Sequence, residues 1–243
     1  MCNKNRLQGG LALLLSMVSL MAVAEGGISY DRNRVVYHEG SHSEAITARN
    51  GGSQLYLLQS GTVTSPGGNE EGPFWVTPPI VRLEGNSQNV LRIIGRPDLL
   101  AALPRDRESV FYFFANAIPA QSGAVEGDNT AHLSIGIKTV LKLFWRPKGL
   151  TGNPDKVAES LKVSMQEGRV VFRNPTSYYA SFAQLTLNGR PVDLNQQPSM
   201  IPPYGELAFA REGTGGQASW RLMTDYGGAS VEQTAPLGVS VAK

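Results

Sequence analysis

The sequence predicts an all-β protein built from two antiparallel sandwiches. Short apolar or alternating runs recur along the chain, and turn-forming Gly, Pro, Asn and Ser residues separate them. No stretch keeps helical spacing for a dozen residues. This spacing is typical of sandwiches rather than of a parallel α/β sheet. Because one such sandwich takes about 100 residues, a mature chain of about 219 residues is long enough for two.

The first 24 residues are predicted to be an export signal. Lys4 and Arg6 make its start positive, the run 11–24 is almost wholly apolar, and a small-x-small cleavage site ends at Ala24. The apolar run has 14 residues, fewer than the about 20 that a membrane-spanning helix needs, which disfavours an anchor. We therefore expect cleavage after Ala24 and an exported protein without stable membrane association.

Charge and cysteine content narrow the class of protein. Loss of residues 1–24 removes two of the 22 basic residues and none of the 20 acidic ones, so the mature chain is balanced. That balance gives no general argument for a nucleic-acid or membrane partner. The one cysteine, Cys2, lies in the signal, so the mature chain has no internal disulfide and depends on packing for stability.

The first domain is predicted to span residues 25–147. Its expected elements begin and end at Gly- or Pro-rich turns such as 49–52 and 66–68, and a single helical turn is expected at Leu99–Leu103. The apolar or alternating runs that predict its strands are Val35–Tyr37, Gln54–Gln59, Val90–Ile94 and Val110–Phe114.

The second domain is predicted to span residues 153–240. The segment 146–154 is rich in turn formers, lacks periodicity and is the natural joint between the domains. Turn signals follow at 188–189 and 213–216. The runs that predict its strands are Leu161–Met165, Arg169–Phe172, Phe182–Leu187 and Leu207–Phe209.

The run 133–145 differs from the other predicted strands. Leu133, Ile135 and Ile137 share one face, and the alternation fades after Thr139, where both faces become apolar. One interpretation is a strand that is exposed first and buried later. The other is an ordinary core strand with one solvent face.

No catalytic site, metal or cofactor is predicted. His38 and His42 have a metal-like interval, but they lie in a predicted strand and turn without a third ligand. Asp106 and Glu108 could in principle form a carboxylate pair of the kind that glycosidases use, but they alternate with Arg105 and Arg107, which favours a salt-bridge network. The chain also lacks nucleophile-elbow and phosphate-loop motifs.

Seven short strings of residues resemble the PapD-like family of periplasmic pilus assembly chaperones of the chaperone–usher pathway. They occur in the family's order and are spread over nearly the whole mature chain. The strings are 31–37 (DRNRVVY), 77–83 (TPPIVRL), 103–113 (LPRDRESVFYF), 137–147 (IKTVLKLFWRP), 174–179 (NPTSYY), 201–205 (IPPYG) and 224–227 (TDYG). The resemblance implies two immunoglobulin-like domains in an L or boomerang arrangement, and a binding protein rather than an enzyme.

The resemblance also implies a mechanism. A pilin subunit lacks one strand of its sandwich, and the chaperone lends its own strand to the open groove and edge. Leu133, Ile135 and Ile137 would enter that groove. By the same resemblance, Arg34 and Lys142 would grip the subunit's C-terminal carboxylate and set the register.

Two further groups of residues come from the resemblance. Glu108, Arg146 and Asp225 match the interdomain salt-bridge residues, with ordinary surface pairs as the alternative. The positions that match the usher-contact face are Tyr56, Leu57, Gln59, Thr77, Pro79 and Arg92. A buried-strand interpretation stays open for Tyr56 and Leu57. Leu55 stands where some members of the family have proline, so control of usher binding through that proline is in doubt.

The 13 residues between Pro119 and Leu133 resemble the short-loop class of these chaperones, which lacks the cysteine pair of the long-loop class. The expected partners are pilin subunits and an outer-membrane usher, and a self-capping homodimer is a further hypothesis. The alternative functions are a two-domain adhesin or structural protein, and an enzyme or carbohydrate-binding module.

Overall fold

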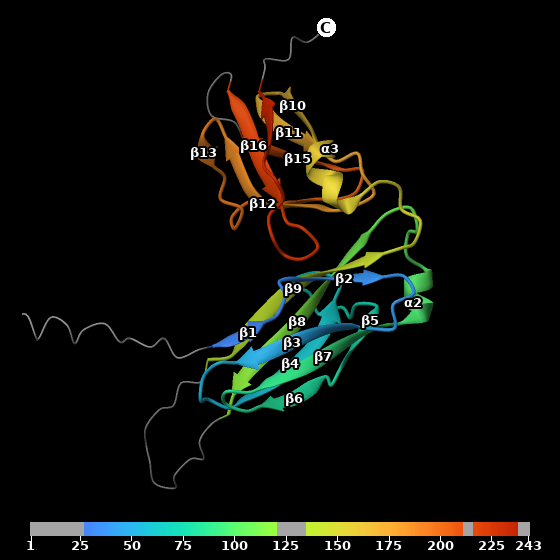
Figure 1. The fold of residues 1–243 in the computed structure, drawn as a ribbon, viewed down its shortest axis with the longest axis vertical. Coiled ribbons are helices and arrows are strands. Elements are labelled where there is room, and N and C mark those ends of the chain that lie inside the picture. The colour runs from blue at the N-terminus through green and yellow to red at the C-terminus, as the bar shows by residue number, and fades with distance from the viewer. Residues whose placement is uncertain (1–26, 121–134, 211–215, 238–243) are drawn as a thin grey trace, which may run out of the picture.

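The computed structural model describes residues 27–120, 135–210 and 216–237. These residues form two β-sandwiches that lie at an angle to each other and meet at one end (Figure 1). The prediction of an all-β, two-sandwich protein is therefore confirmed. The predicted signal 1–24 and the loop up to residue 134, Leu133 included, lie outside the described residues.

The first sandwich packs a sheet of order β1-β3-β7-β5 against a sheet of order β2-β9-β8-β4-β6. Between β7 and β8 lies the helix α2 (Pro97–Ala101), which begins two residues before the expected turn because Pro97 is pre-shaped for a first helical position. The strands are β1 (Ile28–Tyr30), β2 (Arg34–His38), β3 (Glu44–Asn50), β4 (Tyr56–Val63), β5 (Phe74–Thr77), β6 (Ile80–Leu83), β7 (Gln88–Gly95), β8 (Ser109–Pro119) and β9 (Ile137–Arg146).

The second sandwich packs a sheet of order β10-β11-β15 against one of order β13-β12-β16-β17, and β14 pairs with β12. The short helices η1 (Pro154–Lys156) and α3 (Val157–Ser160) lead into it. The strands are β10 (Lys162–Gln166), β11 (Arg169–Arg173), β12 (Ala180–Leu187), β13 (Arg190–Pro191), β14 (Met200–Ile201), β15 (Glu206–Ala210), β16 (Gln217–Leu222) and β17 (Gln233–Pro236).

Each sandwich has its own core, filled by alternate residues of the facing strands. In the first, Ile46 and Leu91 from one sheet meet Phe113 and Leu143 from the other. In the second, the Phe172 ring makes edge contacts with Phe182, Phe209 and Trp220. Two separate cores mean that the angle between the domains depends on the few contacts at their junction.

The strand β9 runs along that junction. On one side it pairs antiparallel with β8 from Ile137 to Trp145. On the other it pairs in parallel with β2, but only from Lys142 to Arg146. The first half of β9 therefore has a neighbour on one edge only, within the part of the chain that the structure describes.

Candidate functional site

The exposed half of β9 has an unpaired backbone edge. Residues 137–141 bond to β8 and have no partner strand on the other side among the described residues. Such an edge presents free N–H and C=O groups, which a strand from another chain can pair with.

Apolar side chains accompany this free edge. Ile135 is 68% exposed and Ile137 46% exposed, whereas Leu143 and Trp145, further along the same face, lie in the core. The face is thus exposed first and buried later, as one of the two interpretations of the sequence predicts. Ile135 precedes β9, which begins at Ile137, because the ladder with β8 ends at the Ala117–Ile137 pair. The strand therefore begins later than position 133, where the alternating run starts.

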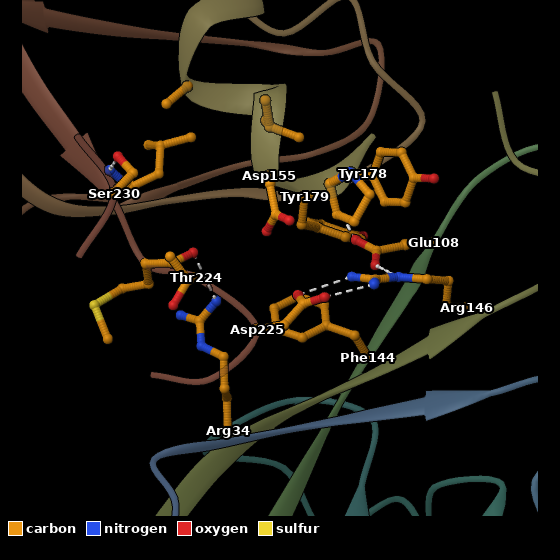
Figure 2. Close-up of a pocket in the computed structure, with 15 residues that line it drawn as sticks. Arg34, Glu108, Phe144, Arg146, Asp155, Tyr178, Tyr179, Thr224, Asp225 and Ser230 are labelled. Atoms are coloured by element: carbon orange, nitrogen blue, oxygen red, sulfur yellow. Dashed lines mark hydrogen bonds and ion pairs between the residues drawn. The ribbon is translucent and has the colours of Figure 1, made fainter. Parts of the chain in front are cut away.

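Arg34 and Lys142 lie side by side at the other end of the free edge. They are register partners between β2 and β9, so both side chains project from the same face of the sheet. The Arg34 guanidinium lies over the Phe144 ring, 5.6 Å from its centroid, and points toward the second domain (Figure 2). Two cations thus converge where the junction between the domains begins.

Neither cation is well satisfied. Arg34 is only 8% exposed; its Nη1 donates to the Met223 carbonyl at 3.4 Å, and its buried Nε has no partner among the described residues. Burial lowers the pKa of Arg34, although the nearby Asp225 and Glu108 oppose this effect. Burial, and then the charge of Arg34, also lower the pKa of Lys142. A buried and a half-buried cation, neither with a counter-ion of its own among the described residues, form a site that an anion would stabilise.

Arg146 bridges two carboxylates from different domains. Its Nε donates to Glu108 Oε1 at 2.6 Å, and its Nη1 and Nη2 donate to the two oxygens of Asp225 at 2.6 and 2.9 Å (Figure 2). The structure thus brings the three predicted interdomain residues together. The side chains of Glu108 and Arg146 are 2% and 10% exposed, so a weak surface pair does not describe them.

Electrostatics at this bridge reflect its burial. Burial raises the pKa of Glu108, against the lowering effect of Arg146. Burial lowers the pKa of Arg146, but its bonds and charge contacts with Asp225 and Glu108 outweigh burial and raise it overall. Because the Glu108 carboxylate also accepts the Tyr179 N–H at 2.7 Å, we take the ion pair as the state at neutral pH.

The local structure around Asn174 brings the second domain to Glu108. Buried Asn174 donates to the carbonyls of Tyr178 and Pro202, and its side-chain oxygen accepts the Thr176 N–H. This folds the segment 174–179 so that the Ser177 carbonyl accepts the Glu108 N–H at 2.9 Å. The family-like string in the second domain therefore has a structural role at the junction.

The hairpin loop after β16 touches the first domain from the other side. The Asn33 side chain donates to the Gly227 carbonyl at 3.0 Å, next to the Arg34 contact with Met223. Gly227 has φ +83°, and a Cβ there would lie 2.4 Å from Asn33 Oδ1. A glycine is therefore required for this close approach.

The residues predicted for usher contact gather on the outside of the first domain, where β5 leads into β6. Leu57 and Gln59 project from β4, Thr77 pairs with Arg92 between β5 and β7, and all four are exposed, as is Pro79. The buried-strand alternative is therefore wrong for Leu57. It applies in part to Tyr56, which is half-buried and packs against the core. Leu55 directly precedes β4.

Two exposed isoleucines extend this face. Leu57 faces Ile118 of β8, and Gln59 faces Ile80 of β6. The three apolar side chains Leu57, Ile80 and Ile118 are 44, 55 and 45% exposed. We call them the outer apolar patch. The sequence analysis missed Ile80 and Ile118, although each continues the alternation of its strand on the solvent side.

Other candidates for chemistry are dispersed. His38 and His42 lie at a strand end and beyond a turn, and the described residues contain no group of three or more His, Cys, Asp or Glu able to hold a metal. Asp106 pairs with Arg107, whereas Arg105 pairs with Glu39. Within the described ranges, no helix is long and apolar enough to cross a membrane.

Family models match both sandwiches. Residues 27–151 match the pili and flagellar-assembly chaperone PapD N-terminal domain, and residues 156–234 match the pili assembly chaperone PapD C-terminal domain. Two immunoglobulin-like domains joined at an interdomain ion bridge thus define a two-domain chaperone fold. The chain belongs to the PapD family of pilus assembly chaperones, which are not enzymes. The domain bounds 25–147 and 153–240 and the short-loop class stay predictions.

Individual relatives agree with this family. The chaperone protein LpfB of Salmonella typhimurium is 34% identical over 93% of this chain and 96% of its own. The chaperone protein FimC of Escherichia coli K12 is 31% identical, with coverage of 92% and 91%. Among solved structures, a chain of the Salmonella enterica SafA pilin–SafB chaperone complex is 29% identical, with a TM-score of 0.76 over 89% of this chain and 99% of its own.

Proposed function

We propose that this chaperone binds pilin subunits by donating the first half of β9 as a missing strand. One observation carries the proposal: residues 137–141 have a free backbone edge, and exposed Ile135 and Ile137 lie along it. A subunit strand would pair with that edge while the isoleucines fill its groove. Each buried isoleucine supplies about 1.5–3 kcal/mol before ordering costs. Leu133 would extend the same row.

The subunit's C-terminal carboxylate is the proposed counter-ion of Arg34 and Lys142. Both cations lie next to the free edge; Arg34 is buried and Lys142 half-buried, and neither has a counter-ion of its own within the described part of the chain. A charge-assisted hydrogen bond to each contributes about 1.5–3 kcal/mol. Because a carboxylate fixed there cannot move by two residues, it would also set the register of the added strand.

The other contacts follow from the same role. The outer apolar patch, with Gln59, Thr77, Pro79 and Arg92 beside it, is the proposed docking face for an outer-membrane usher, because its side chains project from the face of the sheet opposite to Ile137. Arg146, Glu108 and Asp225 would keep the domains at the angle that the subunit requires. The signal would direct export to the periplasm and be cleaved after Ala24. In the absence of a subunit, a second copy would cover the edge of β9 as a self-capping homodimer.

Co-expression with the neighbouring pilin in a periplasm tests the proposal. Wild type, Arg34→Ala and Lys142→Ala are compared for pilin level and for pilin that co-purifies, and each variant's folding is checked by a thermal melt. We expect wild type to hold the pilin and both folded variants to lose it. Variants that hold pilin as well as wild type would show that the anchor is wrongly assigned. A wild type that never holds pilin would favour the adhesin alternative.

A further inference from the structure

The row of side chains that contains Arg34 and Lys142 continues onto β8. Lys142 has Arg34 as its register partner on one side and Tyr112 on the other. Side chains at register positions share a face and lie about 5 Å apart at Cβ. The Tyr112 phenol is therefore the next polar group beside Lys142, and its ring is half-buried.

Tyr179 approaches the same place from the second domain. Its ring packs on Phe144, with 5.6 Å between the centroids, and Glu108 fixes its backbone N–H. Burial raises the pKa of Tyr112 and of Tyr179, and the charge of Tyr112 adds to the shift at Tyr179, so the two phenols face a common region. Both hydroxyls thus stay protonated donors at neutral pH.

Neither hydroxyl has a hydrogen-bond partner among the residues that the structure describes. Neither phenol oxygen is among the buried unpaired atoms, so both hydroxyls are open to solvent and free to donate to a ligand. The two phenol donors lie next to two cations that also lack a counter-ion among the described residues. A carboxylate can accept hydrogen bonds from several donors at once, so Arg34 and Lys142 alone do not fill its acceptor sites.

We propose that Tyr112 and Tyr179 complete the carboxylate site by donating their hydroxyls to the subunit's terminal carboxylate, Tyr112 from the sheet and Tyr179 from the second domain. This inference rests on the proposed function. Because one donor comes from each domain, the site is complete only when the junction holds the domains in place. Arg34 and Lys142 supply attraction, and the two tyrosines supply direction, since a phenol donates along one bond only.

The test uses a peptide of the last 15 or so residues of the neighbouring pilin, made as the free acid and as the C-terminal amide. Dissociation constants for both are measured with wild type, Arg34→Ala, Lys142→Ala, Tyr112→Phe and Tyr179→Phe. A phenylalanine keeps the ring and its packing, so folding should be unchanged, which a thermal melt checks. Tyr56→Phe, a half-buried tyrosine at the far end of β4, is the matched control.

We expect each of Tyr112→Phe and Tyr179→Phe to weaken binding of the acid about tenfold and to leave binding of the amide unchanged. Tyr56→Phe should change neither. Equal losses for acid and amide would assign the tyrosines to packing and overturn the proposal, as would no loss at all. A selective loss at only one tyrosine would contradict the assignment of the other.

Failure of the anchor itself gives a different pattern. If wild type binds acid and amide equally, the carboxylate anchor of the proposed function is wrong, and the role of the tyrosines fails with it. If wild type prefers the acid and Arg34→Ala and Lys142→Ala lose that preference, the anchor stands. The tyrosine results then decide the further inference alone.

Discussion

At the scale of single residues, Lys142 is placed where it weakens the free protein. Its ammonium is partly buried, lies beside Arg34 in the register and has no ion pair among the described residues. A buried charge without a partner costs free energy, and a like charge beside it adds to that cost. The position makes sense if an anion from another molecule supplies the missing charge.

We therefore predict that Lys142→Met stabilises the free chaperone while it abolishes subunit binding. Removal of the unpaired ammonium should raise the free energy of unfolding by about 1 kcal/mol. Urea unfolding followed by tryptophan fluorescence measures this. A matched substitution of exposed Lys138, Lys138→Met, should leave the free energy of unfolding nearly unchanged. A clearly destabilised Lys142→Met variant would mean that Lys142 has a stabilising partner.

The lowered pKa of Lys142 gives a second prediction, on pH. The folded free protein releases this proton below the ordinary value of 10.5, whereas the unfolded chain holds it up to that value. Between the two values the unfolded state binds more protons, so the contribution of Lys142 to stability rises with pH. Affinity for a carboxylate needs the charged form and should fall over the same interval. Titration of the affinity for the free-acid peptide from pH 7 to 10 measures this fall, which the C-terminal amide should lack.

At the scale of elements, β9 combines two functions in one strand. Its second half is a core strand between β2 and β8, and its first half has an unpaired edge with exposed isoleucines. An exposed apolar edge is an aggregation hazard that most proteins avoid, so its presence favours a strand kept free for a partner. The buried half holds the exposed half in an extended shape, which reduces the ordering cost of binding.

We predict that Ile137→Asp weakens subunit binding at least about tenfold and leaves the thermal melt nearly unchanged, because the side chain is exposed in the free protein. The control is Asn116→Asp. It adds the same charge one residue away from Ala117, the β8 partner of Ile137, but on the opposite face of the sheet. Equilibrium binding to the purified subunit measures both. Equal affinity for Ile137→Asp and wild type would place the groove contact elsewhere.

At the scale of the whole molecule, one arginine connects two independently packed domains. Arg146 ends β9, so the strand proposed to bind the subunit also carries the link to Asp225 in the second domain. Backbone contacts of Glu108 with Ser177 and Tyr179 support the same junction. The anchor at Arg34 and the free edge of β9 are thereby held in one arrangement.

We predict that Arg146→Met destabilises the protein by about 3–5 kcal/mol, because it leaves the Glu108 carboxylate buried without its cation. The double variant Arg146→Met/Glu108→Gln should recover part of that loss, since it removes the unpaired charge. Urea unfolding of both variants measures the difference. A double variant that is no more stable than Arg146→Met would contradict this account of the bridge.

The sequence predicted the features that depend on local pattern. Alternating runs such as Val110–Phe114 lie in strands because one face packs on the core. The free edge of β9 could not be derived in this way. It depends on the point at which β2, a strand more than 100 residues earlier, begins to pair with β9. The outer apolar patch and the row Arg34–Lys142–Tyr112 likewise join residues from separate strands. The ion bridge was expected from the family resemblance alone.

The central claim is strand donation by β9, and amide hydrogen exchange by NMR tests it most directly. In the free chaperone, kept dilute enough to be monomeric, those amides of residues 137–141 that do not bond to β8 should exchange fast, because their edge is open. In the complex with the pilin subunit they should become strongly protected, while amides of β6, the edge strand that carries Ile80 of the outer apolar patch, change little. If the β9 amides exchange as fast in the complex as in the free protein, the subunit is bound in some other way.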